Sequence, residues 1–118
     1  MVTCFIRYKI NVLKLDEFEQ YARMWLEIVP RYGGVHHGYF LPHEGENDGA
    51  LAQFSFASLA DYEKYRQASQ SDTEALEAYR YAQEAGCITS YRREFFRPFL
   101  NAKDEARHVQ LSTPSDST

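Results

Sequence analysis

The sequence of 118 residues predicts an α+β fold in which helices cover one face of a four-stranded antiparallel sheet. Four segments have the two-residue alternation or the β-branched and aromatic content of strands. Two regions between them repeat apolar residues every three or four positions, as helices do when they bury one side. Their order along the chain, βαββαβ, is that of ferredoxin-like domains.

The first predicted strand covers residues 3–11, where apolar and polar side chains alternate. Cys4, Ile6 and Tyr8 fall on one side of it, and Phe5 and Arg7 on the other. The first helix begins near Leu15 and carries a stripe of apolar residues that consists of Leu15, Phe18, Ala22, Trp25, Leu26 and Val29. Pro30 and the glycines that follow it predict where this helix ends.

Two strands are predicted at residues 35–41 and 50–57, joined by a polar, glycine-rich turn at 44–49. The second helical region shows two capping signals, Ser58 followed by Asp61 and Ser71 followed by Glu74. It ends at Gly86.

The last strand is predicted at residues 87–99. Residues 1–100 therefore form the predicted domain. The segment 101–118 is polar, has few core-forming residues, and is expected to be a flexible tail.

Composition excludes several classes of partner and compartment. The formal net charge of −4 removes the phosphate attraction that nucleic-acid binders use, so no nucleic-acid partner is expected. Nowhere do 18 consecutive apolar residues occur, which argues against a membrane protein. Cys4 and Cys87 are expected at opposite ends of antiparallel neighbours and therefore unpaired, as suits the reducing cytoplasm.

The face of the sheet away from the helices carries too much apolar surface to remain in water. A second copy of the chain would cover it, giving a homodimer whose two sheets form a dimeric α/β barrel. The residues predicted at this dimer interface are Phe5, Arg7, His36, Phe40, Leu51 and Gln53.

Adjacent residues of a regular strand point to opposite faces, so His36 and His37 are not expected to share a metal ion. Strand alternation groups His37 with Tyr39 and predicts that both face the helices. A small-molecule pocket between sheet and helices is then predicted from Tyr8, Trp25, His37, Tyr39 and Arg93. The alternative is a His37 held by a backbone carbonyl, and a one-residue slip in register would exchange the two histidines.

Several charged residues have two interpretations. Arg7, Arg92, Arg93 and Arg97 crowd neighbouring strands, where one of them would hold an organic acid or pair with acidic groups such as Glu94. His43, Glu44 and Asp48 lie at a turn, whose solvation explains them better than metal binding. No metal or other cofactor is expected.

Four segments carry a family resemblance: residues 3–8 (TCFIRY), 15–18 (LDEF), 34–45 (GVHHGYFLPHEG) and 95–98 (FFRP). With these, residues 1–100 resemble a short bacterial NIPSNAP-domain protein. The resemblance implies a dimeric α/β barrel. The wider structural class includes small monooxygenases, lactone isomerases, haem-binding enzymes and binding modules, and the resemblance carries over no catalytic motif.

Two functions follow as hypotheses. The first is an enzyme that acts, without a cofactor, on a small aromatic or lactone-like molecule in the predicted pocket. The second is a non-enzymatic small-molecule-binding or protein-interaction module, in which the 15% of aromatic residues serve core and dimer contacts.

Overall fold

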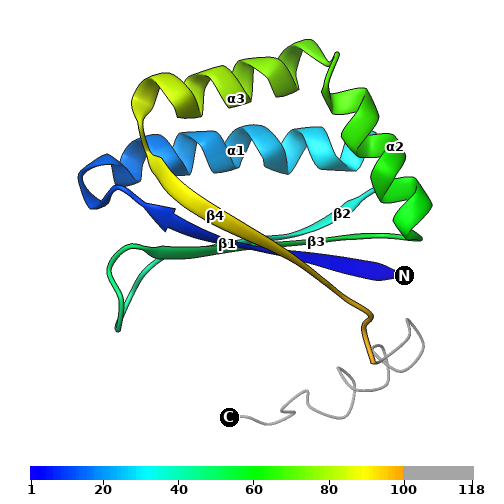
Figure 1. The fold of residues 1–118 in the computed structure, drawn as a ribbon, viewed down its shortest axis with the longest axis horizontal. Helices are drawn as coiled ribbons and strands as arrows, with labels where there is room; N and C mark the ends of the chain where they lie inside the picture. Colours follow the sequence, from blue (N-terminus) through cyan, green and yellow to red (C-terminus); the bar gives the residue numbers. More distant parts are fainter. Residues whose placement is uncertain (100–118) are drawn as a thin grey trace, which may run out of the picture.

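The computed structural model describes residues 1–99, so the predicted tail at 101–118 lies outside the described residues. Its elements are β1 (Val2–Ile10), a short 3₁₀ helix (Val12–Lys14), α1 (Leu15–Arg31), β2 (Val35–Phe40), β3 (Gly49–Phe56), α2 (Leu59–Ser69), α3 (Thr73–Ala85) and β4 (Ile88–Phe96). The strands form one sheet in the order β2-β3-β1-β4 (Figure 1). All its neighbours are antiparallel, which confirms the predicted ferredoxin-like fold.

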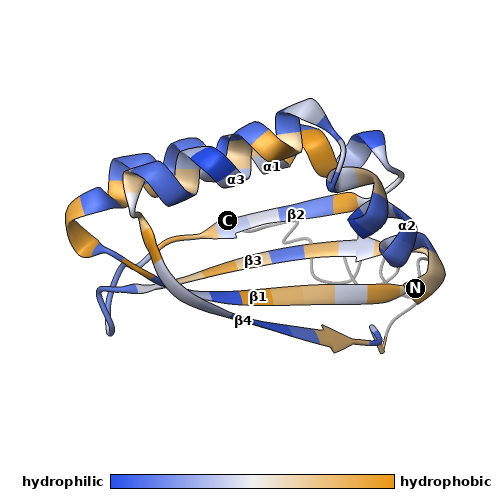
Figure 2. Ribbon diagram, turned by 45° about the horizontal axis from the view of Figure 1, so that its top comes forward, coloured by the Kyte–Doolittle hydropathy of each residue, from blue (hydrophilic) through white to orange (hydrophobic). Residues whose placement is uncertain are grey.

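The helices lie on the same side of the sheet, with α1 and α3 side by side above it and α2 at one end (Figures 1 and 2). The covered face of the sheet and the inner sides of the helices form an aromatic-rich core. Tyr8 of β1 packs edge-on against Phe18 of α1, with their ring centroids 5.1 Å apart. Such edge-to-face pairs contribute roughly 0.5–1.5 kcal/mol beyond the area that they bury.

Side-chain caps fix where the later helices begin. Ser58 accepts a hydrogen bond from the Asp61 backbone N–H at the start of α2, as its spacing predicts. At α3 the prediction is one residue early, because Asp72 rather than Ser71 caps the helix by accepting from the Ala75 N–H at 3.0 Å. The Asp72 carboxylate also accepts from the Tyr32 hydroxyl just beyond α1, so one side chain joins the end of α1 to the beginning of α3.

Gly34, between α1 and β2, is required by a close approach. A Cβ built at this position would lie 2.6 Å from the Val29 side chain and 2.7 Å from the Phe56 ring. Both neighbours are buried core residues that have no room to move away. Only glycine therefore lets β2 enter the sheet so close to α1.

β2 contains a β-bulge, which strand alternation alone does not predict. His36 pairs with Phe54 and Gly38 pairs with Gln53, so His37 is an extra residue without its own partner on β3. Gly38 has a φ of 118°, a backbone conformation that residues with a Cβ rarely adopt. The bulge resets the alternation, and His36 and Tyr39 therefore face the helices while His37 faces away from them.

Within residues 1–99, no helix is both long and apolar enough to cross a bilayer. Cys4 and Cys87 are buried and unpaired. The opposite-end placement predicted for them is observed, since Cys4 pairs with Phe95 near one end of β4 and Cys87 precedes the other end.

Replacing Gly38 with alanine should destabilise the fold, because the bulge would then hold a Cβ in a strained conformation. We expect Gly38→Ala to lower the free energy of unfolding by about 1–3 kcal/mol in urea titrations. Gly49→Ala is the matched control. Gly49 also lies in a strand, but its φ is not positive and the space around its Cβ position is open. Equal stability of the two variants would contradict the account of the bulge.

Candidate functional site

A cavity lies between the sheet and the helices and has two adjoining parts. The inner part, of about 30 Å³, lies against the core, and the outer part, of about 270 Å³, lies beside β4 and α3. The two parts share five lining residues, which are Tyr8, Tyr21, Arg66, Tyr79 and Arg93. Their combined size is near the lower end of small-molecule sites, roughly 300 Å³.

The structure brings together four of the five residues predicted for this pocket. Tyr8, Trp25, Tyr39 and Arg93 line the inner part. The prediction is wrong for the fifth, His37, which lies on the opposite face because the bulge reverses the alternation. His36, assigned to the dimer interface, occupies that place instead, and its ring stacks on Tyr39 with centroids 5.0 Å apart.

The hydrogen bonding of His36 defines which of its nitrogens carries a proton. The Gly38 backbone N–H donates to His36 Nδ1 at 3.0 Å, so Nδ1 is an acceptor and the neutral ring carries its proton on Nε2. Burial lowers the pKa of His36 to about 4, with a further contribution from His37. At neutral pH His36 is therefore an uncharged N–H donor.

Two N–H donors at the inner cavity have no partner among the described residues: His36 Nε2 and Trp25 Nε1. Trp25 is only 5% exposed, so its indole N–H is withdrawn from water as well. A buried donor left without an acceptor costs roughly 1–3 kcal/mol. A ligand that brings an acceptor into the inner cavity could remove this cost.

Tyrosine hydroxyls complete the polar lining. Burial raises the pKa of Tyr8 and of Tyr39 well above the ordinary value, and burial beside Tyr79 raises the pKa of Tyr21 to about 12. These phenols therefore stay protonated at neutral pH. They can donate to or accept from a ligand, but they do not supply a phenolate base.

Of the five lining residues that the two parts share, sequence reasoning missed three, Tyr21, Arg66 and Tyr79. A signal exists for Tyr21, which lies three residues after Phe18 and four before Trp25 on the same stripe of α1. No comparable signal marks Arg66 or Tyr79, since their position depends on how α2 and α3 pack over the sheet.

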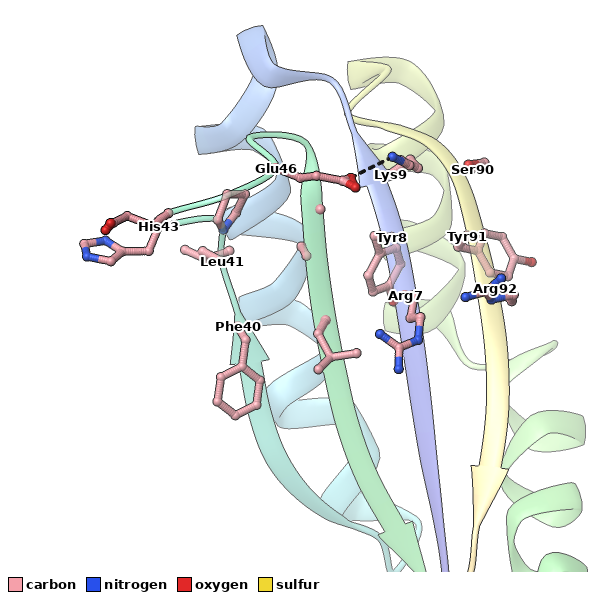
Figure 3. Close-up of a pocket in the computed structure, with 15 residues that line it drawn as sticks. Arg7, Tyr8, Lys9, Phe40, Leu41, His43, Glu46, Ser90, Tyr91 and Arg92 are labelled. Atoms are coloured by element: carbon pink, nitrogen blue, oxygen red, sulfur yellow. Dashed lines mark hydrogen bonds and ion pairs between the residues drawn. The ribbon is translucent and has the colours of Figure 1, made fainter.

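The other face of the sheet is open and holds five of the six residues predicted at the dimer interface. Phe5, Arg7, Phe40, Leu51 and Gln53 lie on or beside its grooves. A broad groove of about 720 Å³ lies at the end near the β2–β3 loop, and Phe40, Arg7 and Arg92 lie over it from three strands (Figure 3). His37 is on this face as well, bonded through Nε2 to the Ser55 hydroxyl at 2.7 Å.

Much of the charge around this open groove is compensated. Arg7 pairs with Glu94 at 3.1 Å, and Lys9 pairs with Asp48 at 3.6 Å. Lys9 also pairs with Glu46 at 3.1 Å (Figure 3). These exposed pairs add little stability. Because the charges are already paired and exposed to solvent, they give no reason to expect a charged ligand in the groove. Among residues 1–99, no three histidine, cysteine or acidic side chains gather as a metal site. The cavity under the helices is the better candidate.

Comparison with known proteins places the chain among related sequences and folds. A family model described as NIPSNAP matches residues 3–102. No curated protein matches.

Solved structures share the fold at low identity. A NIPSNAP family protein of unknown function from Agrobacterium tumefaciens is 18% identical, with a TM-score of 0.72 over 83% of this chain and 87% of that one. An uncharacterised NIPSNAP-like domain protein from Burkholderia xenovorans is 18% identical, with a TM-score of 0.70 over 85% and 88%. A putative antibiotic biosynthesis monooxygenase from Nitrosomonas europaea is 10% identical, with a TM-score of 0.66 over 85% and 100%.

The depressed pKa of His36 should make stability depend on pH. The folded state resists protonation down to about pH 4, whereas an unfolded histidine accepts a proton near 6.5. Stability due to neutral His36 is thus complete above pH 6.5 and is lost as the pH falls towards 4, by about 1–2 kcal/mol after allowance for solvent screening.

Urea unfolding between pH 7 and 4.5 measures this loss, with His36→Phe as the variant that keeps a flat ring but does not titrate. We expect a shallower pH dependence in the variant. An imidazole of His36 that titrates near 6.5 by NMR would contradict the assignment.

Proposed function

The chain belongs to the NIPSNAP family, and we propose that it is an enzyme acting on a small aromatic or lactone-like molecule in the cavity between its sheet and helices. One observation carries the proposal: Trp25 and His36, whose buried side-chain N–H groups have no partner among the described residues, both line the inner cavity. Buried polar groups are nearly always paired, so two unpaired donors in one cavity indicate an acceptor that comes from outside.

The two donors suit chemistry in which negative charge develops on an oxygen atom. Fixed N–H groups in a dry site stabilise a phenolate, an enolate or a lactone carbonyl as it gains charge, and removal of one such donor typically costs about 10²–10³ in rate. Neutral His36 serves as this kind of electrophile because its proton is already on Nε2. N–H donors do not ligate cations, which favours a reaction without a bound metal ion.

The walls of the cavity favour a flat ligand. Tyr39 and His36 stack, and Trp25 packs against Tyr79 with centroids 5.1 Å apart. Aromatic walls of this kind bind planar rings through stacking and edge contacts. The structural similarity to a putative antibiotic biosynthesis monooxygenase supports small-molecule chemistry in this fold without defining the reaction.

A second candidate is a homodimeric binding or interaction module that uses the open face of the sheet. Phe40 and Phe96 are each 51% exposed there, and Phe96 packs edge-on against Phe5. A second copy of the sheet would remove these rings from water, and this burial would favour the dimer by roughly 25 cal/mol of free energy for each Å² of apolar surface. The proposal includes a cytoplasmic location, which the free thiols of Cys4 and Cys87 support.

The enzyme proposal is tested first as ligand binding, with variants of the two adjacent histidines. A ligand that fills the cavity should raise the melting temperature of the wild type in a screen of phenols, enols and lactones. We expect His36→Ala to lose most of this shift, corresponding to at least tenfold weaker binding. His37→Ala, on the opposite face, should retain it. If no compound discriminates between the two variants, the cavity is not the binding site.

The assembly is tested separately by sedimentation velocity at micromolar concentration. We expect the wild type to sediment as a dimer. Phe40→Lys should convert it to a monomer, because a charge would then be buried in the apolar contact. Leu59→Lys is the matched control, since Leu59 is 54% exposed but lies on α2, away from the open face. A wild type that stays monomeric at these concentrations excludes the dimer.

A further inference from the structure

Two guanidinium groups lie at the cavity beneath the helices. Arg93 extends from β4, and Arg66 from the last turn of α2, and both line the inner and the outer part. They come from elements distant in sequence, so the fold itself brings two positive charges to one site. Their side chains are partly buried, in contrast to the exposed Arg92 and Arg97 on or beside the same strand.

Neither guanidinium has a carboxylate partner within residues 1–99. The arginines that form ion pairs in this part of the chain are Arg7, Arg23 and Arg31. Arg93 instead donates to the neutral Tyr62 hydroxyl at 3.1 Å and lies over the Tyr91 ring, 5.8 Å from its centroid. No acidic residue of the described chain is among those that line the cavity.

Such a pair of charges is costly when it is left alone. A partly buried guanidinium loses favourable free energy of hydration. A hydrogen bond to a phenol or a contact with an aromatic ring offsets only part of that loss and does not neutralise the charge. Two like charges at one cavity also repel each other. The chain as a whole has a net charge of −4, so this local excess of positive charge does not reflect a basic protein. An incoming anion would relieve both penalties.

We propose that the ligand of the cavity is a small organic carboxylate with an oxygen atom at its far end. Its carboxylate pairs with Arg66 and Arg93, and its phenolic, enolic or lactone oxygen accepts from Trp25 and His36 in the inner part. The planar fork of a guanidinium matches a carboxylate through two parallel hydrogen bonds. This inference rests on the proposed function and adds to it the charge of the ligand and its orientation.

Trp25 makes the test direct, because it is the single tryptophan of the chain. Its indole N–H gives one NMR cross-peak, and the residue lines the inner cavity. The probes are 4-hydroxybenzoate and 4-hydroxyphenylacetate, each compared with its uncharged amide. We expect each acid to shift the indole cross-peak and to bind at least tenfold more tightly than its amide.

Arginine variants separate the charge of the ligand from the cavity itself. Arg93→Gln and Arg66→Gln should each reduce the preference for the acid at least fivefold while the affinity for the amide stays within twofold. Arg92→Gln is the matched control, since Arg92 is the neighbour of Arg93 on β4 but lies on the open face. Arg93→Lys should fall between the wild type and Arg93→Gln, because it keeps the charge but loses the fork.

The outcomes distinguish the two proposals. Acids and amides that bind equally well, with no effect of Arg66 or Arg93, would overturn the anionic ligand and leave the proposed function standing. A cross-peak that moves with none of the four probes at millimolar concentration would overturn both. If Arg93→Gln fails to fold, as shown by loss of its melting transition, Arg66→Gln alone decides the matter.

Discussion

The central position of β1 is the constraint on which the rest of the fold depends. It pairs with β3 along one edge and with β4 along the other, so these two strands take their register from it directly, and β2 follows through its pairing with β3. Its alternate residues Cys4, Ile6, Tyr8 and Ile10 are all at most 6% exposed, and a slip of one residue would send this buried row into the open face. The aromatic core, the cavity and the position of Arg93 opposite Ile6 all follow from that single register.

The fold can be predicted from the sequence wherever a single local pattern determines the type and position of an element. The alternation in β1 and the cap at Ser58 are present in the structure as predicted. The apolar stripe of α1 is confirmed except at Leu26, which is 41% exposed, and the buried side of the helix also includes Tyr21 and Ile28. The NIPSNAP resemblance, carried by four short segments, is confirmed by the family match over residues 3–102. The cap of α3 is displaced by one residue, since Ser71 and Asp72 are both good capping residues and tertiary contacts with Tyr32 and Arg31 favour Asp72.

The candidate site is less predictable, because it depends on the bulge and on how separate elements pack. A glycine inside a strand pattern is itself a sign of a bulge, and Gly38 carries that sign in the sequence. A prediction that assumes regular alternation over residues 35–41 takes no account of the bulge, and it therefore assigns His36 and His37 to the wrong faces of the sheet. The site that results differs in chemistry from the one predicted, since His36 is fixed as a neutral donor by a backbone N–H of the bulge itself. No local pattern brings Arg66 to Arg93, because their meeting depends on the placement of α2.

The bulge in β2 also behaves as an insertion that the sheet absorbs within one residue. Val35 and His36 before it, and Gly38, Tyr39 and Phe40 after it, keep the successive partners on β3 that a regular strand without His37 would have. A related chain that lacks one residue here would therefore place the same side chains beneath the helices. In an alignment with such a shorter chain, the gap belongs opposite His37, and an ungapped alignment would match cavity residues with residues of the open face.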